Sequence, residues 1–129
     1  DVGGEDGYNL VPVFNGQSTS GRATLVSHSI SGHFAIRQGD WKLCLAAGSG
    51  GWSAPREQDA LRQNLPSMQL FKLAEDKAEQ NNLIKTHPER AQELLKILQT
   101  EVDNGRCTPG AKISNDRQIA FLPKGVIIK

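Results

Sequence analysis

Hydrophobic and polar positions alternate with period two in three neighbouring segments of the chain. The alternation covers residues 22–30, 33–38 and 41–47, and the turn signals between the segments are Ser31-Gly32 and Gly39-Asp40. Successive side chains of a strand point to opposite faces, and such short turns join antiparallel neighbours. The pattern therefore predicts a three-stranded meander. One strand face carries Phe34 and Ile36, and the face of the next strand carries Trp41, Leu43 and Leu45.

The alternation is then interrupted and resumes once. Residues 48–66 are rich in glycine, serine, proline and polar side chains, which predicts a loop. Loops longer than about 12–15 residues are uncommon in compact domains and are more often functional. Residues 67–74 restore the strand pattern, with Leu70 and Phe71 on opposite faces, and residues 75–82 predict an Asp- and Asn-rich turn.

A single amphipathic helix follows. Thr86 and Glu89 stand at the spacing of a capping box, and Gly105 is suited to end the helix. The apolar stripe consists of Ala91, Leu94, Leu95, Leu98 and Val102. We therefore expect an α+β fold, a small antiparallel sheet of about four strands with one C-terminal amphipathic helix packed on one face.

Length and composition restrict this picture. The 129 residues fit one domain, and we divide them into a connector with one apolar patch (1–20), a folded unit (21–105) and an irregular tail (106–129). Fifteen Lys and Arg side chains against 14 Asp and Glu suggest no nucleic-acid partner. No apolar run approaches the roughly 20 residues of a membrane span. Two cysteines, Cys44 and Cys107, leave both pairing and redox compartment open.

Composition and spacing alone assemble no active site. The three histidines, His28, His33 and His87, lack metal-ligand spacing, and His33 and His87 are expected to be structural. The Gly-rich run GSGG at 48–51 lacks the lysine and the following helix of a phosphate-binding loop. The acids of the turn and the long loop, Asp40, Glu57 and Asp59, are expected to be solvated.

Five segments, in order along the chain, carry a resemblance to a known family. They read DGYNLVPVFNG, LVSHSISG, FAIRQGDWKLCLAAGSGGWS, QLFKLAEDKAEQNNL and HPERAQELLKILQTEVDNGRCTPG. Together they resemble the C-terminal region of the arylsulfatases, over about residues 6–116. The departures are Lys77 and Ala78 in the turn, Phe71 in place of a tyrosine, and a tail after Asp116 that matches nothing in the family.

The resemblance implies that the catalytic groups lie elsewhere. Sulfatases make a formylglycine from Cys or Ser in a C/S-x-P-x-R motif, bind a calcium or magnesium ion, and keep both in a large N-terminal domain. The run CTPGA begins like that motif, but Ala111 stands where Arg is required. We therefore expect this chain alone to be inactive and to hold no catalytic residue, metal ligand or cofactor. Its first residue, Asp1, fits either a cut chain or a processed one.

The family also implies roles for particular residues. The loop corresponding to residues 48–53 reaches the mouth of the substrate pocket, where glycine amides would approach an anionic ester and Trp52 offers a flat face. Candidate pocket residues are His28, Gly48, Ser49, Gly50, Gly51, Trp52 and Ser53. Trp52 is equally compatible with packing, and Trp41 is expected to pack. Arg37 alternates away from Ile36 and faces either the catalytic domain or water.

The function implied is therefore that of a C-terminal subdomain of an arylsulfatase-type sulfuric ester hydrolase. Its partners would be the N-terminal catalytic domain of the same polypeptide and, through that domain, a sulfate ester. The alternative is a stand-alone sulfatase-like module that binds carbohydrate or protein. A chain separated from its catalytic domain is expected to expose apolar surface and to self-associate. Export to the periplasm, the cell exterior or lysosomes is implied by the family alone.

Overall fold

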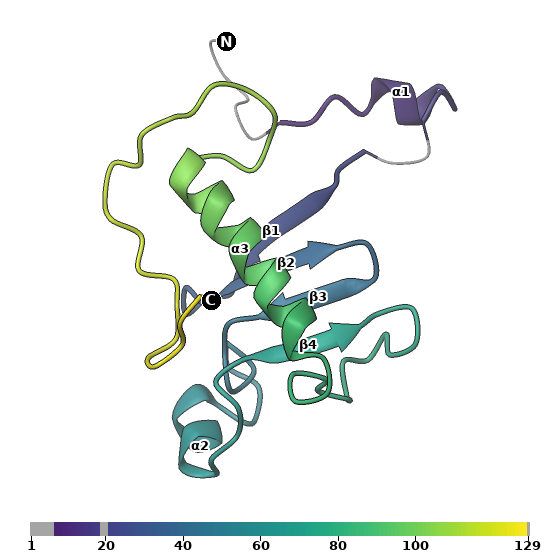
Figure 1. Ribbon diagram of the computed structural model, residues 1–129. Coiled ribbons are helices and arrows are strands. Elements are labelled where there is room, and N and C mark those ends of the chain that lie inside the picture. Colours follow the sequence, from purple (N-terminus) through teal and green to yellow (C-terminus); the bar gives the residue numbers. More distant parts are fainter. Residues whose placement is uncertain (1–6, 19–20, 129) are drawn as a thin grey trace.

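The fold is described by a computed structural model for residues 7–18 and 21–128. Residues 1–6 and 19–20 of the predicted connector and residue 129 of the tail lie outside the described residues. The strands form one four-stranded sheet, and Figure 1 shows a long helix crossing it. The elements in chain order are α1 (Val11–Phe14), β1 (Thr24–His28), β2 (Phe34–Gln38), β3 (Trp41–Cys44), α2 (Glu57–Arg62), β4 (Gln69–Lys72) and α3 (Pro88–Asn104).

The sheet is antiparallel throughout and has the order β1-β2-β3-β4. Its register aligns Val26, Ile36, Leu43 and Leu70 in one row across all four strands. Strand side chains alternate, so the neighbouring rows point to the opposite face. Gly39, with φ +58°, closes the turn between β2 and β3 in a conformation that favours glycine. The predicted meander, its fourth strand and the α+β class are confirmed.

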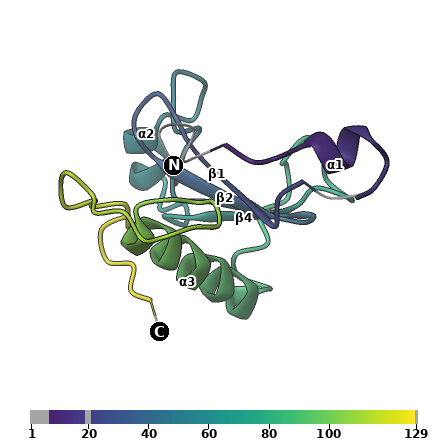
Figure 2. The same cartoon turned by 90° about the horizontal axis from the view of Figure 1, so that it is seen from above.

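Helix α3 covers the face that carries the apolar row. It contacts β2 and β3, and Figure 2 shows it lying along one side of the sheet. The predicted stripe is confirmed, because Ala91, Leu94, Leu95 and Leu98 are buried and Val102 packs against them. None of the helices in the described ranges is long and apolar enough to cross a membrane.

The ends of α3 differ in how well the sequence predicts them. Gly105 adopts the left-handed conformation at the C-cap, with φ +66°, as predicted. The predicted capping box is wrong, because His87 is the N-cap residue and no side chain caps the helix. The Thr86 hydroxyl instead donates to the Leu83 carbonyl at 3.1 Å, within a turn whose backbone amides bond the same carbonyl.

Two short helices lie in segments for which we expected none. Helix α1 is formed by the apolar patch of the connector, and α2 lies inside the segment predicted as one long loop. Ala60 of α2 is fully buried, and its carbonyl accepts a hydrogen bond from the Leu65 amide at 3.0 Å. Four to six residues give too short an apolar period to be distinguished from a loop.

The tail forms no helix or strand between residues 106 and 128. Figure 1 shows it leaving the end of α3 and returning alongside that helix. Phe121 is only 8% exposed, and its ring meets the Phe34 ring edge-on at 6.1 Å. Val126 and Ile128 also pack against the core. The irregular tail therefore completes the hydrophobic core on the α3 side.

Candidate functional site

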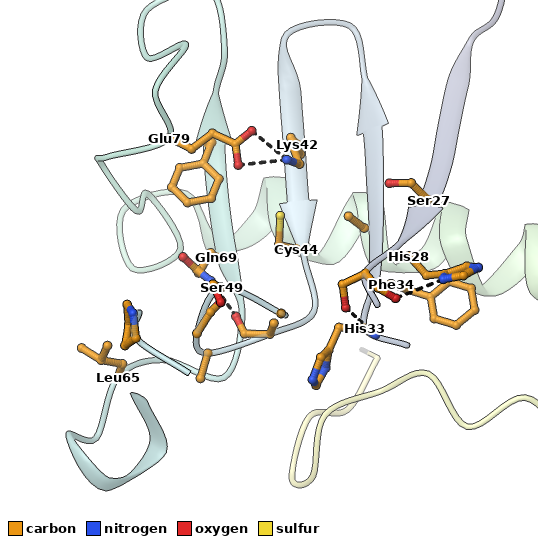
Figure 3. A pocket seen from close by; sticks show the side chains of 18 of the residues that line it. Ser27, His28, His33, Phe34, Lys42, Cys44, Ser49, Leu65, Gln69 and Glu79 are labelled. Atoms are coloured by element: carbon orange, nitrogen blue, oxygen red, sulfur yellow. Dashed lines mark hydrogen bonds and ion pairs between the residues drawn. The ribbon is translucent and has the colours of Figure 1, made fainter. Parts of the chain in front are cut away.

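The sheet face opposite α3 carries a mixed set of polar and apolar side chains. The register places Leu25, Arg37, Lys42 and Phe71 in one row of this open face, and Ser27, Ala35, Cys44 and Gln69 in the next. A cavity of about 590 Å³ lies over these rows, and Figure 3 shows the side chains that line it. We call it the sheet pocket. It extends to His28 at the end of β1 and to the loop at residues 48–50.

Residues 46–48, where the predicted loop begins, are held in place by hydrogen bonds from two side chains. The Gln69 side-chain amide donates to the carbonyls of Ala46 and Gly48 at 2.9 and 2.8 Å. The Glu57 carboxylate accepts from the amides of Ala47 and Gly48 at 3.0 and 2.8 Å. A Cβ on Gly48 would lie 2.5 Å from the Pro55 carbonyl oxygen, so only glycine fits there. Residues 47–48 and residues 55–57 therefore lie against each other.

The next residues of the loop, 49–53, are held in place by the side chain of Ser49. Its hydroxyl donates to the Ser53 carbonyl at 2.7 Å and accepts from the Gly51 amide at 3.2 Å, which fixes the chain on both sides of Trp52. The Ser49 amide donates to the Pro55 carbonyl at 2.9 Å. The amides of residues 47, 48, 49 and 51 therefore have partners within the protein. An anionic ligand at this loop would be contacted by side chains rather than by these four amides.

The structure brings some of the predicted pocket residues together and separates others. His28 lines the sheet pocket with Gly48, Ser49 and Gly50, and Figure 3 shows it at one end of the cavity. Its Nδ1 lies 3.2 Å from the Ser29 carbonyl oxygen. Gly51 and Trp52 line a different hollow, which shares only Gly50 with the sheet pocket. Ser53 lines neither cavity and contributes its carbonyl to the loop.

The other singled-out residues have structural surroundings. Trp41 packs against the core as predicted, with the His87 ring 5.2 Å away. The Nδ1 of half-buried His33 lies 3.2 Å from the Leu45 carbonyl oxygen, the kind of structural contact we expected. Arg37 is exposed on the open face, where its Nε donates to the Gly39 carbonyl at 2.9 Å. That position permits an interface role, which stays a prediction.

An ion pair at the sheet pocket escaped sequence analysis. Lys42 Nζ donates to both carboxylate oxygens of Glu79 at 2.7 and 2.9 Å, and Figure 3 shows the pair above Cys44. Burial raises the pKa of the Cys44 thiol, Lys42 opposes that rise, and Glu79 adds to it. Cys44 and Cys107, both within the described ranges, form no disulfide. The sequence did hold one signal for this ion pair. Lys42 lies between Trp41 and Leu43 in a predicted strand, so its cation was expected on the face opposite theirs.

A second polar cluster, on the helix side, also escaped sequence analysis. The Glu101 carboxylate accepts a hydrogen bond from the Thr24 hydroxyl, which joins α3 to the edge strand β1. Its second oxygen is buried and has no partner among the described residues. Burial raises the pKa of Glu101, while the Thr24 hydrogen bond and the charge of Arg22 oppose that rise. A cavity of about 370 Å³ adjoins this carboxylate.

The acids of the turn and loop do not form a catalytic carboxylate pair. Glu57 is turned into the loop, Asp59 pairs with Arg62 at 3.2 Å, and Asp40 is exposed. In the described part of the chain, no three His, Cys, Asp or Glu side chains are grouped so that they could hold a metal ion. The calcium or magnesium ion implied by the family resemblance therefore has no fitting ligand set among these residues.

Comparison with known proteins finds similarity to solved structures. No protein-family model matches the chain, and no curated protein matches it. A matching solved structure is a Bacteroides thetaiotaomicron protein described as a 6S sulfatase in the metabolism of multiple glycosaminoglycans. Its TM-score is 0.53 at 25% identity, over 70% of this chain and 18% of that one. This chain therefore spans less than a fifth of that sulfatase, and its fold is that of a sulfatase-related region.

Proposed function

We propose that this chain is the C-terminal subdomain of an arylsulfatase-type sulfuric ester hydrolase. It supplies part of the substrate-pocket wall and stabilises the enzyme, and it contributes neither the formylglycine nor a metal ligand. The observation that carries the proposal is the structural likeness to a sulfatase over 70% of this chain. The ordered family-like segments between residues 6 and 116 support it independently.

The open face of the sheet supports the proposal of a partner domain. An antiparallel sheet commonly buries one face and exposes the other to water, and the exposed face is then mainly polar. Here the open face combines Leu25, which is 47% exposed, with Arg37 and the Lys42–Glu79 pair. An exposed leucine among charged side chains is a feature that a docked domain can cover. The proposed occupant is the N-terminal catalytic domain of the same polypeptide.

The sheet pocket supplies the proposed wall. His28 reaches it from the end of β1, and the loop at residues 48–50 closes it from the other side. Glu57 and Gln69 hold that loop in place, so its shape is set before a substrate arrives. In this proposal the imidazole of His28 contacts the anionic ester or the group that bears it, and thereby influences which sulfate ester is accepted.

The test uses the complete protein that contains this chain. His28→Ala is predicted to change kcat/KM unequally among several sulfate esters, because it removes a contact to the substrate rather than a reactive group. His87→Ala is the matched control, since His87 lies at the start of α3 and outside the sheet pocket. Equal kcat/KM for His28→Ala and the unaltered protein on every ester would refute the pocket-wall role.

A further inference from the structure

The two edges of the sheet, β1 and β4 in Figure 1, differ in how their outward backbone groups are used. Strand β4 turns the amide and carbonyl of Leu70 away from the sheet. The Asn82 side chain accepts from that amide at 3.0 Å, and the Leu83 amide donates to that carbonyl at 2.8 Å. The Lys72 carbonyl accepts from the Asp76 amide at 3.0 Å. The segment that follows β4 therefore closes this edge.

Strand β1, at the opposite edge, has no such cover. The Ser29 amide donates to the His33 carbonyl at 2.9 Å, which fixes the phase of the hydrogen bonds between β1 and β2. In an antiparallel pair, every second residue bonds to the neighbouring strand. The even-numbered residues of β1 therefore turn their amides and carbonyls outward. These residues are Thr24, Val26 and His28. Among the described residues, no group bonds to their outward amides and carbonyls.

Strand β1 also lacks the features that protect an edge strand from pairing. Exposed edges are commonly blunted by lysine, proline or a bulge. The strand reads TLVSH, without proline or any Lys, Arg, Asp or Glu, and its register with β2 is unbroken from Thr24 to His28. An unpaired and unprotected strand edge fits one kind of partner, an extended polypeptide segment that adds a further strand.

The helix side of the same edge is incomplete as well. The cavity of about 370 Å³ on that side is lined by Val26 of β1, by Phe34 of β2 and by the end of α3. The Glu101 carboxylate accepts from the Thr24 hydroxyl, and its second oxygen is buried without a partner within the described ranges. Every second side chain of an added strand would point to this face. The cavity can take one such side chain, and a hydroxyl or amide on it can donate to Glu101.

We propose that an extended segment of the catalytic domain pairs with β1 and adds a fifth strand to this sheet. This inference rests on the proposed function, in which that domain precedes this chain. A protein of the matched sulfatase's size has ample length for such a segment, because the matched region is only 18% of that chain. The added strand satisfies the outward backbone groups of β1 and covers Leu25 on the open face.

The chain that leads into β1 favours this occupant over a second copy. Leu10 lies against Gly21, and the Arg22 guanidinium carbon is 5.9 Å from the centre of the Tyr8 ring. Residues 8–10 are thus held beside the residues just before the edge strand, and a domain that precedes them is tethered there. A short tether gives an effective concentration of about millimolar, which a separate copy reaches only in very concentrated solution.

The test is amide hydrogen exchange at single-residue resolution, in the complete protein and in this chain at a concentration where it is monomeric. In this chain, the inward amides of Leu25 and Ser27 are expected to exchange slowly and the outward amides quickly. In the complete protein, the outward amides of Thr24, Val26 and His28 are expected to exchange at least about tenfold more slowly than in this chain, because each gains a hydrogen-bond partner.

Substitution of Val26 separates the outward backbone from the side chain. Val26→Pro removes the central outward amide without removing a bond to β2. Val26→Ala is the matched control, because it shortens the same side chain and keeps the amide. In the complete protein, Val26→Pro is expected to return the outward amides of Thr24 and His28 to fast exchange, and Val26→Ala is not. Slow exchange of Leu25 and Ser27 in both variants verifies that the sheet is still folded.

Fast exchange of the outward amides in the complete protein would refute the added strand. Slow exchange that appears only as the protein concentration rises would assign the edge to a second copy and overturn the proposed occupant. Sulfate ester hydrolysis by a complete protein with fast outward amides would overturn this inference and leave the proposed function standing. Slow outward amides at every concentration, in a complete protein that hydrolyses no sulfate ester, would overturn the proposed function and support a strand from the same polypeptide.

Discussion

At the scale of single residues, the long loop is defined by contacts that do not show in the sequence pattern. Glycines and a tryptophan at 48–53 marked the segment as unusual, but Glu57 and Gln69, which hold it, looked like ordinary polar residues. Their roles depend on a chain reversal that brings residues 55–57 against residue 48. Sequence periodicity carries no signal for such a contact.

Replacement of Gly48 tests that contact. Gly48→Ala is expected to destabilise the fold by about 1–3 kcal/mol, the usual range for overpacking, because the new Cβ would collide with the backbone at Pro55. Gly51→Ala is the matched control, since its Cβ would lie 3.5 Å from the nearest atom, the Ile30 Cγ2. Urea denaturation measures both. Equal stability of the two variants would contradict the close approach.

Glu101 gives a pH-dependent prediction. Its pKa is raised in the folded protein, mainly by burial, so the folded state binds this proton more tightly than the unfolded state does. The free energy of unfolding therefore falls as pH rises from glutamate's usual pKa through the raised value. The side chain of glutamine does not titrate, so the stability of Glu101→Gln relative to the unaltered protein should increase as pH rises across this range.

The measurement is urea denaturation at several values between about pH 4 and pH 8. Glu93→Gln controls for the loss of one negative charge from α3, because Glu93 is exposed on the same helix. Parallel curves of stability against pH for the unaltered protein and Glu101→Gln would show that the carboxyl does not titrate differently in the folded state.

At the scale of elements, prediction succeeds where many residues repeat one signal. The stripe of α3 and the alternation of the four strands each draw on several positions, and both are confirmed. Helices α1 and α2 are too short to carry such a signal. The capping box failed because Thr86 is used by the preceding turn, a contact that depends on the placement of Leu83.

The packing of α3 can be tested at its centre. Leu95→Ala is expected to cost about 2–5 kcal/mol, the range for large-to-small changes in a core, because the side chain is fully buried beneath the helix. Leu61→Ala on α2 is the matched control, since its side chain is 50% exposed. A cost below that of the control would contradict the placement of α3 as the main cover of the sheet.

At the scale of the whole molecule, the sheet has one face covered by α3 and a second face that is only partly exposed, because Leu25 and Arg37 are exposed there whereas Phe71 is buried. The apolar row, α3 and the tail together form one core, whereas Leu25, Arg37 and Lys42 face away from it. The alternation of the strands predicted two such faces, and we propose that the catalytic domain covers the second one. We also propose that the formylglycine and the cation lie in that domain.

The open face makes self-association of the isolated chain an expected outcome. Two copies can pair along the edge strand β1, where Leu25 is 47% exposed. Sedimentation of a concentration series should therefore give a rising average mass, and Leu25→Lys should reduce the rise. Leu61→Lys, on α2, is the control. A single monomer mass at every concentration would contradict this expectation.

The most direct test of the central claim is the release of sulfate. The complete open reading frame that contains these 129 residues is expressed, and hydrolysis of 4-nitrophenyl sulfate is compared with that by the isolated chain. We predict that the complete protein hydrolyses the ester through a formylglycine in a C/S-x-P-x-R motif, and that this chain alone does not. A complete protein without that motif, or without hydrolysis of any sulfate ester, would contradict the assignment to a sulfatase.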